Sequence, residues 1–225
     1  SPHNPVGRVW SRDELERLGQ ICVDNDILIV SDEIHCDIVF RGKKHVPIAS
    51  LNEAFAANSI TCMSPSKTFN LAGLQTAYAV IPDAKKRDCF AAANKVHRAN
   101  AFGLEALIAA YNGGEAWLED MLDYLEGNLQ FLKDFVARHM PGVTAAPLEG
   151  TYLAWLDCTR IGADPRELDR LIVEEARVWL DDGLMFGPGG AGFQRINLAC
   201  PRSILEKALK RLEQVMAGSR PPVTL

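Results

Sequence analysis

The order of the predicted elements constrains the fold most, because helix and strand patterns alternate along the first 115 residues. Residues 11–22 open with a capping-box pattern and continue with an apolar helical stripe. The run Ile27–Val30 is apolar throughout, as in a parallel strand buried on both faces. Ser59–Met63 and Ala77–Ile81 also have strand patterns, and Pro82 ends the latter. This order predicts an α/β sheet.

The pattern changes near residue 115. Residues 115–139 form one long amphipathic stretch, which predicts a single helix ended by Pro141 and Gly142. Short strand patterns at 151–156 and 195–198 then alternate with helical patterns at 165–176 and 201–216. We therefore predict a boundary here, with an α/β part over residues 1–115 and a smaller α+β domain over 116–225. Residues 219–225 are expected to fray.

Composition narrows the functional classes. The 24 basic and 29 acidic residues give a net charge of −5, which argues against a nucleic-acid-binding protein. No apolar run is long enough to span a membrane. The six cysteines lack any C-x-x-C pair, so we expect free thiols in a reducing cytoplasm and no metal site. The chain starts in a turn, without Met or a signal peptide, so we expect a fragment.

A lysine follows the second strand pattern in the string Ser64-Pro65-Ser66-Lys67. Small hydroxyl residues precede Lys67 and an apolar, glycine-containing stretch follows it, which places the amine where it is desolvated. Burial lowers the pKa of a lysine, and a neutral amine forms Schiff bases. A lysine in a loop is ordinarily a surface residue, but these neighbours favour a catalytic one.

Three other polar sites lie at the ends of predicted elements, where active sites of open α/β sheets collect. Asp32 directly follows the first strand pattern, and a buried carboxylate there needs a partner unless it caps a helix. Arg195 begins a late strand, where it binds either a substrate carboxylate or a structural acid. The stretch His3–Gly7 has good turn chemistry.

Taken together, these residues resemble the fold-type I pyridoxal-phosphate (PLP) enzymes of the aspartate aminotransferase superfamily. Asn4, Asp32, Lys67 and Arg195 occur in the family's order, separated by 28, 35 and 128 residues. The resemblance covers essentially the whole chain. It implies a mixed, mostly parallel sheet in the C-terminal part of a PLP-binding large domain, followed by a small C-terminal domain.

The resemblance also implies a role for each residue. Lys67 would bind PLP covalently and later move the Cα proton, and Asp32 would pair with the pyridine nitrogen. Asn4 would hydrogen-bond the phenolic oxygen of the cofactor. Arg195 would bind the α-carboxylate of the substrate. Ser64 would bind the phosphate, with Ser66 as the weaker candidate.

Two departures from the family pattern point to one branch. His35 stands where many aminotransferases have a tyrosine that contacts the phenolic oxygen, and Gln75 stands where many have a phosphate-binding arginine. Both are usual in the MalY/PatB-type C–S β-lyases. The strings Ser31–Asp37, Lys67–Gln75 and Phe193–Pro201 also resemble that branch.

The branch implies α,β-elimination of cystathionine or related cysteine S-conjugates to a thiol, pyruvate and ammonia. An aminotransferase acting on a small or aromatic amino acid is the alternative, because both reactions use the same residues. The sensing domain of a transcription regulator is a third reading. We expect a homodimer, by resemblance. The 225 residues alone are expected to bind PLP weakly and to be inactive, since the family completes its site with an upstream half.

Overall fold

The computed structural model describes residues 1–94 and 98–218, which fall into two compact units. The first unit contains residues 1–3 and 9–122, and the second contains residues 4–8 together with the chain from 123 onward. Helix α6 (Glu115–His139) begins in the first unit and ends in the second, with the bounds that the sequence predicts. The domain boundary at residue 115 stays a prediction, and the fraying predicted for residues 219–225 lies outside the described residues.

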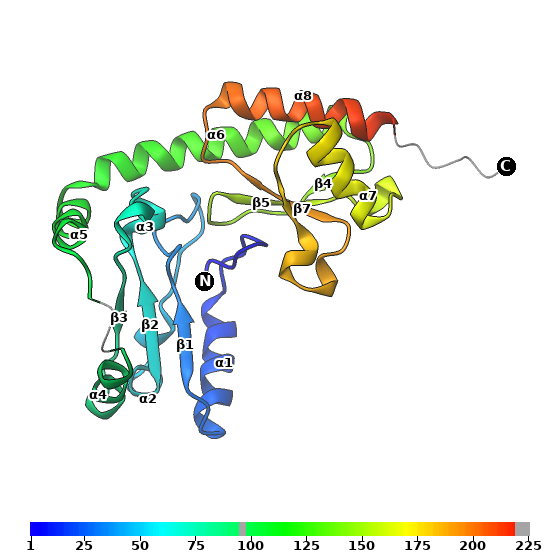
Figure 1. Cartoon of the computed structure of the whole chain (residues 1–225). Helices are drawn as coiled ribbons and strands as arrows, with labels where there is room; N and C mark the ends of the chain where they lie inside the picture. Colours follow the sequence, from blue (N-terminus) through cyan, green and yellow to red (C-terminus); the bar gives the residue numbers. More distant parts are fainter. Residues whose placement is uncertain (95–97, 219–225) are drawn as a thin grey trace. The chain divides into compact units, whose positions relative to one another are not determined.

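The first unit is built on a three-stranded sheet of β1 (Ile29–Asp32), β2 (Ser59–Met63) and β3 (Tyr78–Val80) (Figure 1). Strand β2 lies in the middle, parallel to β1 and antiparallel to β3. Asp32 at the end of β1 is in register with Cys62 of β2. The predicted α/β fold with a mixed sheet is confirmed.

Helix α1 (Arg12–Asp24) begins at the predicted capping box. The Ser11 hydroxyl accepts a hydrogen bond from the Glu14 amide at 3.3 Å, and a Glu14 carboxylate oxygen accepts one from the Ser11 amide at 3.0 Å. The adjoining core contains Leu15, Ile29, Ile48 and Phe55. Gly19 is needed in α1 because a Cβ there would lie 2.5 Å from the Phe55 ring.

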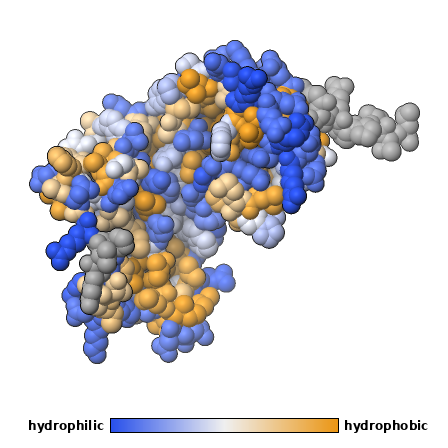
Figure 2. All heavy atoms as spheres, viewed as in Figure 1, coloured by the Kyte–Doolittle hydropathy of each residue, from blue (hydrophilic) through white to orange (hydrophobic). Residues whose placement is uncertain are grey.

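The first strand differs from its prediction. It covers Ile29–Asp32 rather than Ile27–Val30, and Val30 is 64% exposed, so burial on both faces is wrong. Within the described residues β1 pairs with β2 alone, so it is an edge strand and its flank stays open. The predicted apolar stripe of α1 is also partly exposed, at Leu18 and Ile21. Apolar side chains gather on the surface of this unit in Figure 2.

The first unit contains further turns and helices besides its strands and α1. They are two 3₁₀ turns, η1 (Ile48–Ser50) and η2 (Ala72–Leu74), and four helices, α2 (Glu53–Ala57), α3 (Pro65–Thr68), α4 (Ala84–Ala93) and α5 (Ala101–Gly113). Helices α4 and α5 have no counterpart among the predicted elements. Little of α5 is buried, although the helix is mostly apolar.

The second unit has an antiparallel sheet in the order β4-β5-β7-β6. Its strands are β4 (Thr144–Ala145), β5 (Leu153–Asp157), β6 (Asp181–Asp182) and β7 (Phe193–Asn197). Its helical segments are α7 (Pro165–Arg170), the π-helix η4 (Leu171–Glu175), α8 (Arg202–Gly218) and the 3₁₀ turns η3 (Thr159–Ile161), η5 (Gly183–Phe186) and η6 (Pro188–Gly190). The helix predicted over 165–176 is thus an α-helix followed by a π turn.

The core of the second unit lies under α6 and α8, which run side by side in Figure 1. Its fully buried leucines include Leu125, Leu132, Leu156, Leu198 and Leu209. Asn128 of α6 is also fully buried, and its amide donates to the carbonyl oxygens of Leu198 and Cys200. These bonds anchor α6 to the connection between β7 and α8. No helix in the described part of the chain is long and apolar enough to cross a membrane.

Candidate active site

Most of the predicted site residues lie at one edge of the first unit's sheet. Because β1 and β2 are parallel and Asp32 is in register with Cys62, the carboxyl ends of both strands meet there. Asp32 is the last residue of β1, and the segment Ser64–Lys67 directly follows β2. The fold therefore brings an acid, two hydroxyls and a lysine to one sheet edge.

Asp32 is exposed, whereas the sequence predicted a buried carboxylate. Its Oδ1 accepts a hydrogen bond from the Ile34 amide at 3.2 Å, an Asx turn rather than a helix cap. Asp32 lies on the same face of β1 as the exposed Val30, and the described elements leave that face uncovered. Because the Asp32 carboxylate is exposed, it needs no cationic partner to offset desolvation, and its charge remains available to a ligand.

Lys67 lies in the short helix α3 and is half-buried. Its side chain forms no ion pair or hydrogen bond with the described residues 1–94 and 98–218. The amine is therefore not engaged in a structural contact within the described residues.

The two serines before Lys67 differ in how far they are already engaged. Ser64 is buried, and its Oγ accepts from the Ser66 amide at 3.0 Å and donates to the Thr76 carbonyl at 2.6 Å. Its Oγ also lies 2.6 Å from the Ser66 Oγ. Because a hydroxyl has one proton and Thr76 accepts it, Ser64 must release Thr76 before it donates elsewhere. The hydroxyl of the half-buried Ser66 donates to the Ser64 hydroxyl in this arrangement. Turning the Ser66 hydroxyl toward a ligand would therefore break no hydrogen bond to a backbone carbonyl.

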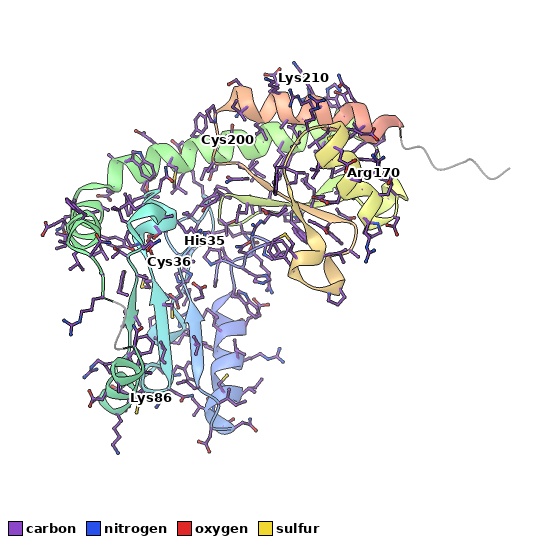
Figure 3. All side chains as sticks on the ribbon, viewed as in Figure 1. His35, Cys36, Lys86, Arg170, Cys200 and Lys210 are labelled. Carbon is purple, nitrogen blue, oxygen red and sulfur yellow. The ribbon has the colours of Figure 1, made fainter. Side chains whose placement is uncertain are left out.

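The turn after β1 carries His35 and Cys36, which Figure 3 labels, and Asp37 follows them in the sequence. The His35 side chain is 4% exposed, so it is a buried ring rather than a solvated one. Burial, followed by the nearby charge of Asp37, raises the pKa of Cys36 to about 12. Since raising the pKa of a thiol favours its protonated form, Cys36 is a neutral thiol at pH 7 and not a nucleophile.

Three contacts of this edge were missed by the sequence analysis. The Thr68 hydroxyl donates to Asp37 Oδ2 at 2.8 Å, linking the turn after β1 to α3. The buried Glu33 lies 2.8 Å from Nε2 of His45, and its other oxygen accepts from the Ser31 hydroxyl at 2.9 Å. The only signal for Glu33 was its position beside Asp32, and nothing in the sequence indicated His45.

Gln75 stands where the family pattern often has a phosphate-binding arginine. The residue is exposed and has φ of +49°, the left-handed conformation, at the end of η2. A neutral amide at this position supplies hydrogen bonds but no positive charge. Position 75 therefore supplies no positive charge to a phosphate at this edge.

The other two predicted residues, Asn4 and Arg195, meet within the second unit. Arg195 of β7 donates from Nη1 to Asn4 Oδ1 at 2.6 Å, and from Nε and Nη2 to Asp181 Oδ2 at 3.0 and 2.7 Å. Because a guanidinium only donates, the contact assigns the Asn4 oxygen and leaves the Asn4 amide nitrogen to face other acceptors. The structural acid that the sequence analysis kept as an alternative partner of Arg195 is therefore present.

The family profile named "Aminotransferase class I and II" matches residues 1–212. The chain belongs to this family. It is 40% identical over 220 residues to "Cystathionine beta-lyase PatB" of Bacillus subtilis, covering 96% of this chain and 57% of that protein. It is 35% identical over 224 residues to "Protein MalY" of Escherichia coli, covering 98% and 57%.

A solved structure extends the likeness to three dimensions. A PLP-bound protein of Clostridium difficile 630, assigned as an aminotransferase, superposes with a TM-score of 0.93 at 48% identity, covering 96% of this chain and 57% of that one. The chain thus spans little more than half the length of the relatives it matches. The fold class and the family resemblance predicted from the sequence are both confirmed.

Proposed function

We propose that this chain is part of a PLP-dependent C–S β-lyase that cleaves cystathionine or related cysteine S-conjugates to a thiol, pyruvate and ammonia. The observation that carries the proposal is the sheet edge at which Asp32 ends β1 and the segment containing Lys67 follows the parallel strand β2. Its residues fit PLP, since an amine without a structural contact, an exposed carboxylate and two hydroxyls lie at one edge. The relatedness to the Bacillus subtilis and Escherichia coli proteins supports the lyase branch.

Each residue has a task in this proposal. Bound PLP supplies an electron sink for the negative charge that develops at Cα of the amino acid. Lys67 holds the cofactor, and its amine then accepts the Cα proton. Asp32 keeps the pyridine nitrogen protonated, and His35 and Asn4 contact the phenolic oxygen. Ser64 and Ser66 bind the phosphate, and Arg195 binds the substrate's α-carboxylate.

The test is a pyruvate assay with cystathionine and PLP in the absence of any keto acid. It uses a completed enzyme, a chimera that joins this chain to the part of Bacillus subtilis PatB that the chain does not match. We expect pyruvate and ammonia in equal amounts. A reaction that depends strictly on an added keto acid would contradict the lyase assignment.

An aminotransferase is the second candidate, and the Clostridium difficile structure assigned to that activity favours it. The same lysine serves both reactions. An elimination needs a leaving group at Cβ, whereas a transamination returns the proton to the cofactor. The pyruvate assay separates them, because a transaminase consumes one keto acid for every amino acid converted.

We also propose that two copies of this chain pair through α5. Phe102 of α5 is 81% exposed, and Leu104 and Ile108 are about half exposed, so an almost wholly apolar helix lacks cover within the described unit. Light scattering of the chain is expected to give a dimer that Phe102→Glu converts to a monomer. The control Trp179→Glu changes a residue of the second unit that is 86% exposed, and it should leave the chain dimeric. A monomeric parent chain contradicts this pairing.

We further propose the domain assignment and the compartment. Residues 1–115 form the C-terminal part of the PLP-binding large domain, and residues 116–225 form the small domain. The six cysteines of the described structure are all free, including the exposed Cys89, which supports a cytoplasmic location.

A further inference from the structure

Three hydrogen bonds and an aromatic ring fix the guanidinium of Arg195. Asp181 of β6 lies directly opposite Arg195 of β7 in the sheet, so the register itself aligns the pair. Nε and Nη2 donate to the same oxygen of Asp181, and Nη1 donates to Asn4. The guanidinium carbon also lies 4.7 Å from the centroid of the Phe186 ring. Contacts on two edges and one face therefore set the orientation of the group.

These contacts leave a defined set of donors. A guanidinium has five N–H groups, and one acceptor oxygen that binds both Nε and Nη2 occupies the edge they share. Arg195 makes no other side-chain hydrogen bond within residues 1–94 and 98–218. One N–H therefore remains on each terminal nitrogen, Nη1 and Nη2. Two N–H groups are what a carboxylate accepts when it binds a guanidinium as a fork.

We propose that Asp181 is a positioning residue that orients Arg195 toward the substrate's α-carboxylate, an inference that rests on the role proposed above for Arg195. Asp181 accepts from Nε and from one N–H of Nη2, so one N–H of each terminal nitrogen is left to the ligand. Without it, the long side chain regains rotamers that a ligand must then restrict. Because orientation depends on the acceptor oxygen, Asp181→Asn should preserve it and Asp181→Ala should lose it.

Asp182 provides a matched control. It lies next to Asp181 in β6, pairs with Gln194 rather than Arg195, and accepts from the Leu184 amide at 3.2 Å. An asparagine keeps this cap. Asp182→Asn therefore removes a charge from the same strand without touching the guanidinium.

The first test uses nuclear magnetic resonance on the chain itself, with sodium acetate as the carboxylate probe. The Arg195 Nε–H signal is assigned by its loss in Arg195→Lys. We expect saturable shifts with acetate but not with chloride, and acetate binding at least threefold weaker in Asp181→Ala. Asp181→Asn and Asp182→Asn should bind acetate no more weakly than the parent. Equal binding in parent and Asp181→Ala, no saturable binding in the parent, or Asp181→Asn as weak as Asp181→Ala would overturn the inference.

The second test measures kinetics in the completed enzyme. Asp181→Ala is expected to raise KM about tenfold and to change kcat by less than threefold, because the residue acts on carboxylate binding. A loss confined to kcat would overturn the positioning role. If the chimera forms no pyruvate while acetate binding still depends on Asp181, the proposed function fails and the orientation of Arg195 stands.

Discussion

Replacing Lys67 with alanine is expected to abolish pyruvate formation by the completed enzyme, with a loss of at least about 10³-fold. The variant removes both the covalent attachment of PLP and the base at Cα. The yellow absorbance of lysine-bound cofactor should vanish as well. Absorbance spectra and the pyruvate assay measure the two losses separately.

Lys133→Ala is the matched control for this loss. Lys133 is half-buried in α6 and, like Lys67, makes no ion pair with the described residues, but it lies in the second unit. Its variant should keep both colour and activity. If Lys67→Ala retained the yellow absorbance with a normal thermal transition, another amine would be the attachment point and the assignment of the site would be wrong.

The sequence predicts the elements of this fold well where a local pattern decides them. The capping box of α1 and the bounds of α6 follow from short-range patterns, and both are found in the structure. The burial of β1 depends on what covers each face of the sheet, and no local pattern contains that information. Val30 and Asp32 share a face that the described elements leave uncovered, so both are exposed.

The same distinction applies to the site. Lys67 and Asp32 were predicted because their neighbours in sequence mark them. Asp181 and His45 were missed because folding brings each to a distant partner. Asp181 lies 14 residues from Arg195, and His45 lies 12 residues from Glu33. A pairing that depends on register, such as Asp181 with Arg195, is visible only once the strands are aligned.

Replacing Asp32 with asparagine is expected to reduce pyruvate formation about 100-fold while the yellow absorbance persists. An opposite charge near an ionisable group shifts its pKa by about 1–3 units toward the charged form. Without the Asp32 carboxylate, the pKa of the cofactor's ring nitrogen falls, and the neutral ring stabilises the developing Cα charge less well. Asparagine retains an oxygen for the Ile34 amide, so the turn after β1 should stay intact.

Asp157→Asn is the matched control for Asp32→Asn, because it removes the charge of an aspartate that makes the same kind of turn away from the site. Asp157 makes the same kind of contact, accepting from the amide of Thr159 two residues later at 2.9 Å, but it lies in β5 of the second unit. Its variant should retain full activity, and both variants should unfold at the temperature of the parent. As the pH rises, the ring nitrogen loses its proton in Asp32→Asn, whose ring-nitrogen pKa is lowered, before it does so in the parent. The activity deficit of Asp32→Asn relative to the parent should therefore widen from pH 6 to pH 9. A deficit that stays constant over this range would mean that Asp32 acts by shape alone and that its charge does not take part in the reaction.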